Sequence, residues 1–130
     1  MRLRNMVLAR ELSDEEAYLE YLEKLRWPKG VKCTKCGKKK ISRITSRGTT
    51  GKPRHLYQCL VCRTQFTIRT GTILQDSYLP LKKWFKAISL VLQGTNVATL
   101  QREIDVQYRT AEYLMSRIHD ARSRGERLEV

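Results

Sequence analysis

Apolar side chains recur at intervals of three and four positions over residues 17–25, a spacing that predicts a helix with one apolar stripe. Ser13 followed by Glu16 makes a capping box at the start of this helix, and Pro28 ends it. We expect the stripe to cover the strands that follow. Residues 1–12 are mixed in character and fit either a frayed tail or a short strand, so they receive no assignment.

The middle of the chain predicts short strands. The segments KKISRIT, RHLYQC and TQFTIR are rich in β-branched and aromatic residues, and the turn-rich stretch SRGTTGKP separates the first two. Together they predict a three-stranded antiparallel ribbon, with Phe66 and Ile68 on one face of the third strand.

From Leu79 onward the apolar period becomes helical. Pro80 suits the start of a helix that Gly94 can end, Asn96 suits the cap of a second helix, and a third helix is predicted over residues 107–122. The polar tail SRGERLEV is expected to be disordered. The inward positions are Leu81, Trp84, Phe85, Ile88 and Leu92, then Val97, Leu100 and Ile104, then Ala111, Leu114 and Ile118.

Four cysteines form two C-x2-C pairs, Cys33 with Cys36 and Cys59 with Cys62, separated by 22 residues. Two residues between thiolates let a tight turn place both sulfurs on one tetrahedral zinc ion. Gly37 can adopt the positive φ that points backbone amides at the sulfurs. A redox dithiol needs a thioredoxin-like βαβ setting, and disulfides need an oxidising compartment, so we expect one structural Zn²⁺.

The predicted fold class is therefore a small α+β protein with an N-terminal helix, a zinc ribbon and a three-helix helix-turn-helix module. We expect four segments along the chain. These are residues 1–26, a tail and helix packing on the ribbon; residues 27–75, the zinc ribbon; residues 76–125, the helix-turn-helix module; and residues 126–130, a tail.

The formal net charge of +13 favours a polyanionic partner, and its distribution is uneven. Residues 24–75 hold 14 Lys and Arg and no Asp or Glu, whereas residues 1–23 sum to −3 and residues 76–130 to +2. Solvated faces usually mix both signs, so the ribbon is predicted to bind phosphates. The candidate phosphate contacts are Lys38, Lys39, Lys40, Arg43, Arg47, Lys52 and Arg54.

In the predicted helix-turn-helix, residues 104–106 form the turn, where Asp105 replaces the usual glycine. Gln101 stands where a small residue normally allows close packing. The alternative is a plain three-helix bundle. His55 and His119 belong to no catalytic constellation that the sequence reveals. The side chains left for the DNA groove are Gln107, Tyr108, Arg109, Thr110, Tyr113 and Arg117, of which Arg109 best suits a bidentate guanine contact.

The stretches RWPKGVKCTKCG, RTGTILQDSYLPLKKWF and YRTAEYLMSRIHDAR resemble bacterial insertion-sequence transposases that begin with a transposase zinc-ribbon domain. The resemblance runs over roughly residues 13–122. It implies zinc ligation by the four cysteines and recognition of terminal inverted repeats by the helical part. Family members continue into an RNase H-like catalytic domain, which this sequence does not contain, so no enzymatic activity is expected.

These inferences predict a cytoplasmic, nucleoid-associated protein of bacterial type that binds double-stranded DNA. No apolar run approaches the length of about 20 residues that spans a bilayer, so no membrane partner is expected. An intact transposase or a second copy of the chain is a further candidate partner. The alternatives are a zinc-ribbon module that docks on a protein or RNA assembly, a standalone regulator of transcription or transposition, and a subunit acting with a separate catalytic chain.

Overall fold

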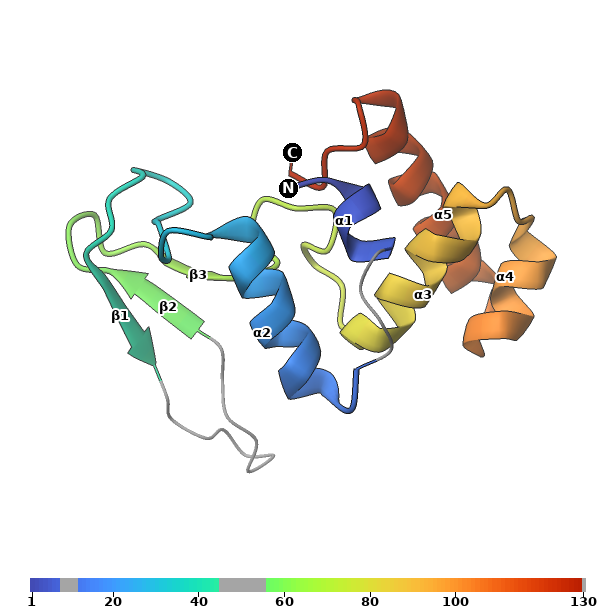
Figure 1. The fold of residues 1–130 in the computed structure, drawn as a ribbon, viewed down its shortest axis with the longest axis horizontal. Coiled ribbons are helices and arrows are strands. Elements are labelled where there is room, and N and C mark those ends of the chain that lie inside the picture. The colour runs from blue at the N-terminus through green and yellow to red at the C-terminus, as the bar shows by residue number, and fades with distance from the viewer. Residues whose placement is uncertain (8–11, 45–55, 130) are drawn as a thin grey trace.

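The computed structural model describes residues 1–7, 12–44 and 56–129. Over these residues a three-stranded sheet lies at one end of the molecule, α3, α4 and α5 lie at the other, and α2 lies between them (Figure 1). The predicted small α+β class is confirmed. The elements are α1 (Leu3–Val7), α2 (Glu15–Arg26), β1 (Ile41–Ile44), β2 (Leu56–Cys59), β3 (Gln65–Thr67), α3 (Leu81–Leu92), α4 (Val97–Ile104) and α5 (Tyr108–Ser123).

The ribbon is antiparallel throughout, in the order β1, β2, β3, as the sequence predicts. Tyr57 of β2 lies opposite Phe66 of β3, and both side chains are buried. The ring of Trp27 packs edge-on against each of these two rings, with centroids 5.8 Å apart in both pairs. This aromatic cluster and the buried Cys33 and Cys59 form a core too small to hold the ribbon together alone.

The larger core is helical and is built around α3. This helix contacts α1, α2, α4 and α5, which explains why its apolar face is broad. Leu81, Trp84 and Ile88 are completely buried in it. Ile68 lies just after the end of β3 and is buried in this helical core, whereas Phe66 is buried in the ribbon core. The two residues predicted to share one face of the third strand therefore belong to different cores.

The apolar stripe of α2 packs on the helices, and the prediction that it covers the ribbon is wrong. Tyr18 and Leu22 are buried in the helical core, and the Tyr18 ring meets Phe85 edge-on at 4.9 Å. The physical reason is that α3 offers the larger apolar surface, while Trp27 already covers the small face of the ribbon. The cap is also corrected: Asp14, not Ser13, accepts a hydrogen bond from the Ala17 amide at 2.9 Å.

The C-terminal tail is ordered, contrary to the expectation from its polar composition. Leu128 is completely buried, and its amide donates to the Met1 carbonyl at 3.0 Å. Its own carbonyl accepts from the Ile73 amide at 2.9 Å, so both chain ends lie side by side against the helical core (Figure 1). One leucine among charged residues therefore fixes a segment that composition alone marks as disordered.

Candidate metal centre and nucleic-acid interface

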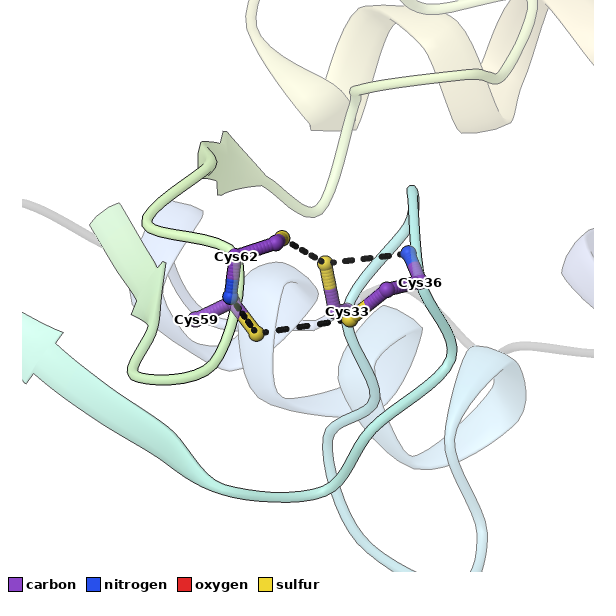
Figure 2. A group of neighbouring side chains, drawn as sticks. All are labelled: Cys33, Cys36, Cys59 and Cys62. Carbon is purple, nitrogen blue, oxygen red and sulfur yellow. Dashed lines mark hydrogen bonds between the residues drawn. The ribbon is translucent and has the colours of Figure 1, made fainter.

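The four cysteines converge from two loops. Cys33 and Cys36 lie in the loop before β1, and Cys59 and Cys62 lie at the turn between β2 and β3 (Figure 2). The sulfur pairs Cys33 with Cys62 and Cys36 with Cys59 are each 3.5 Å apart, and all four sulfurs lie within 4.8 Å of one another. Sulfurs bound tetrahedrally to zinc at about 2.3 Å are about 3.8 Å apart, so this set fits one ion.

The two loops repeat the same backbone turn. The Gly37 amide donates to the Cys33 carbonyl at 3.0 Å, and the Arg63 amide donates to the Cys59 carbonyl at 2.9 Å. Both turn residues have a positive φ, 75° at Gly37 and 66° at Arg63. The conformation expected for Gly37 is confirmed, and Arg63 adopts it in spite of its side chain.

Each turn also aims backbone amides at a sulfur. The Cys36 amide lies 3.4 Å from the Cys33 sulfur, and the Cys62 amide lies 3.5 Å from the Cys59 sulfur. Such hydrogen bonds favour the thiolate that binds a metal. Because four cysteines fill a tetrahedral shell, no coordination position stays open for substrate, and the site is structural.

Without metal, the thiols of Cys36 and Cys62 differ in acidity. The hydrogen bond between the Cys62 sulfur and the Thr64 hydroxyl, together with the Thr64 backbone amide, lowers the pKa of the Cys62 thiol to about 6. The Lys38 amide lowers the pKa of Cys36, but desolvation and hydrogen bonds with the other three sulfurs outweigh it and raise that pKa to about 11. The group thus holds protons that a bound metal displaces.

The helical module contains the predicted turn between α4 and α5. Asp105 has φ 54° and ψ 67°, the left-handed conformation that a glycine usually adopts at this position. The Asp105 amide donates to the Gln101 carbonyl, and the Asp105 carbonyl accepts a hydrogen bond from the Lys83 ammonium at 3.0 Å. Lys86 binds the Glu103 carbonyl at 3.0 Å in the same way. Two lysines of α3 therefore fix the geometry of the turn.

The side chains predicted to face inward on α5 do so. Ala111, Leu114 and Ile118 are completely buried. The Arg109 guanidinium is exposed and makes no hydrogen bond or ion pair with any residue that the structure describes. The Arg117 guanidinium lies 5.1 Å from the centre of the Tyr113 ring. Of the six predicted groove residues, Gln107, Tyr108, Arg109 and Tyr113 are exposed, and Thr110 and Arg117 are half-buried.

The described cations of the ribbon separate into exposed side chains and side chains with a partner. Lys38, Lys39 and Lys40 are exposed side by side before β1. Arg43 instead forms an ion pair with Glu23 and lies over the Tyr57 ring at 5.3 Å, so its charge already has a partner. The predicted phosphate contacts Arg47, Lys52 and Arg54, and also His55, lie outside the described residues.

Two arginines of the basic run are structural, which sequence analysis did not reveal. Arg26 donates to the Ile68 carbonyl at 2.8 Å. Arg69 donates to the carbonyls of Ser77 at 3.0 Å and Leu79 at 2.8 Å. Burial lowers the pKa of both guanidiniums, although they stay cationic. Both side chains tie the end of β3 to its surroundings.

Sequence analysis also missed a surface beside α5. A groove runs between the loop of residues 76–80 and the start of α5, lined by Arg109, Thr110 and Tyr113 from the helix. Tyr78, at the middle of the loop, is the most exposed of the large hydrophobic residues in the described ranges, at 100%. The only available signal was a tyrosine in the polar stretch QDSY.

The chain is similar to proteins of transposable elements. The family model of the transposase zinc-ribbon domain matches residues 13–65. An uncharacterized protein in the transposable element ISH50 of Halobacterium salinarum is 33% identical over 90 residues, which are 68% of this chain and 29% of the relative. That relative is archaeal, so the resemblance extends beyond bacterial elements. No solved structure matches the chain. None of the helices in the described ranges is long and apolar enough to cross a membrane.

The residues that match the family model include all four cysteines whose sulfurs converge in the structure. Residues 13–65 form a transposase zinc-ribbon domain, in which Cys33, Cys36, Cys59 and Cys62 are the ligands of one structural zinc ion.

Proposed function

We propose that this chain binds double-stranded DNA as the recognition region of an insertion-sequence transposase or of a standalone relative. The observation that carries the proposal is the first turn of α5. It follows a left-handed turn at Asp105 and presents on an exposed surface the guanidinium of Arg109, which pairs with no residue in the described ranges. This is the placement by which a recognition helix reads base edges in the major groove.

The two modules divide the task. Lys38, Lys39 and Lys40 on the ribbon contact phosphates without regard to sequence, and this part of the affinity falls as salt rises. Arg109 donates two hydrogen bonds to a guanine, and the neighbouring side chains contact the flanking bases and phosphates. Terminal inverted repeats of the mobile element are the proposed target, which associates the protein with the nucleoid.

We assign no catalytic step to these residues. The chain spans 29% of the length of its relative, and cutting and joining of DNA belong, in this proposal, to the remainder of such a protein. That chemistry uses carboxylates converging on metal ions, whereas the zinc of this chain has a full thiolate shell and serves the fold.

The test is a binding titration of the zinc-loaded protein against duplex DNA, single-stranded DNA and hairpin RNA, each at two salt concentrations. A preferred duplex is then selected from a random pool. Arg109→Ala should weaken binding to that duplex by about 5-fold to 150-fold, with little change in the salt dependence. Arg122→Ala is the matched control, because Arg122 is exposed at the opposite end of the same helix. Preference for RNA, or no nucleic-acid binding, would refute the proposal.

A further inference from the structure

Tyr78 is held in place although its side chain touches solvent on all sides. The loop of residues 76–80 is braced from two directions. Arg69 binds the carbonyls on either side of Tyr78, those of Ser77 and Leu79. Trp84 of the helical core donates from its indole nitrogen to the Ser77 hydroxyl at 3.0 Å. The backbone that carries the exposed ring is therefore rigid.

The surroundings of the ring indicate a ligand. Exposed aromatic side chains are ordinary, but this one borders a groove whose other wall is the first turns of α5. Arg109 and Tyr113 come from the proposed recognition surface. The loop and the helix thus form one continuous surface, and a duplex bound by α5 passes directly beside Tyr78.

We propose that Tyr78 is a second DNA-contacting element, whose ring packs on a deoxyribose and whose hydroxyl donates to a phosphate of the strand bordering the groove that α5 enters. The inference rests on the proposed function. Tyrosine suits this role because its ring supplies rigid contact area and its hydroxyl bonds to phosphate oxygens. The groove lining carries both signs of charge, so a phosphate is attracted to Arg109 and repelled by Asp76.

Arg69 acts here as a positioning residue. Its planar guanidinium reaches two carbonyls at once, which a lysine cannot reproduce with the same geometry. The loop of a variant that lacks this clamp loses the fixed placement of Tyr78, and an unfixed side chain gives up part of its binding energy when it becomes ordered.

The experiment measures affinity for the selected duplex, and for random duplex, with the full zinc-loaded chain. Tyr78→Ala should weaken binding about 5-fold to 10-fold for both duplexes, as expected for a backbone contact, and Tyr78→Phe should lose about half of that effect on a logarithmic scale. The melting temperature should not change, because the side chain is fully exposed. Val61→Ala, another exposed apolar side chain on the tip of the second zinc loop, is the control.

A double-mutant cycle separates positioning from folding. Arg69→Lys should weaken binding about 3-fold to 5-fold when Tyr78 is present and less than about 2-fold in the Tyr78→Ala background. Equal losses in both backgrounds would overturn the positioning role. If wild-type protein binds and Arg109→Ala weakens it, but Tyr78→Ala stays within about 2-fold, the inference fails alone. If wild-type protein does not bind duplex DNA, the proposed function fails first.

Discussion

Arg63→Gly should stabilise the zinc-loaded protein, although glycine usually destabilises. The two zinc loops have the same turn, but one carries glycine and the other carries Arg63 with φ 66°. The left-handed conformation costs a residue with a side chain about 1 to 2 kcal/mol. Glycine itself destabilises the protein by about 0.5 to 1 kcal/mol, because it increases the conformational entropy of the unfolded chain. The difference is a net stabilisation of about 0.5 to 1 kcal/mol.

The assay is thermal unfolding at fixed free zinc, together with zinc affinity by competition with a chelator. A stabilisation of this size raises the melting temperature by about 2 to 4 °C in a chain of this length. Gly37→Ala is the reciprocal change. A Cβ at Gly37 meets nothing within 4 Å, so any destabilisation there, expected to be about 0.5 to 1 kcal/mol, reports the backbone conformation alone.

Charge offers a competing explanation, because Arg63 adjoins the ligand Cys62 and a site of four thiolates around zinc carries a negative charge. Arg63→Ala separates the two effects, since it removes the charge but keeps a side chain in the left-handed region. If conformation dominates, Arg63→Gly is more stable than wild type and Arg63→Ala is close to it. A loss of stability in both variants would refute the conformational reasoning and assign the role to the charge.

Two further changes test the links that hold the modules. Cys59→Ser, or a strong chelator, should release zinc and unfold the ribbon. The readout is a red shift of the fluorescence emission of Trp27, because this side chain packs on the aromatic rings of the ribbon. An unchanged emission spectrum would show that zinc is not needed for folding. Glu15→Ala should lower the free energy of unfolding, measured with denaturant, by about 1 kcal/mol. The reason is that the Glu15 carboxylate accepts a hydrogen bond from the Leu81 amide at 2.6 Å, while Pro80 offers α3 no side-chain cap. Glu15→Gln keeps an acceptor and should lower the free energy of unfolding less.

Local rules were sufficient for most elements of the fold. The strands, the three C-terminal helices and the Asn96 cap follow from periodicity and capping chemistry, which act over a few residues. The partner of the α2 stripe was not predictable in this way, because the competition between ribbon and α3 depends on surfaces that only the folded chain brings together. The same applies to Leu128, which is buried in the helical core and hydrogen-bonded to Met1 and Ile73, both far away in the sequence.

The site divides in the same manner. Cysteine spacing identified all four sulfurs, since two residues between ligands fix their geometry locally. Tyr78 was not predicted, because the periodicity of apolar residues identifies buried positions and the Tyr78 side chain is fully exposed. The groove beside it forms only when the loop and α5 meet.

Not every positive charge in residues 24–75 is available to bind phosphates. Composition treats its 14 positive charges as one field, but Arg26 and Arg69 are half-buried donors to backbone carbonyls and Arg43 is paired with Glu23. A guanidinium already held by carbonyls or a carboxylate has little counterion to release to DNA, so these three should add little to the salt dependence of the proposed binding. The same side chains instead join the ribbon to the helices. Arg26 holds the end of β3, and Arg69 holds the loop beside α5, so part of the positive charge serves to fix the position of the ribbon, with its proposed phosphate contacts, relative to the proposed recognition helix.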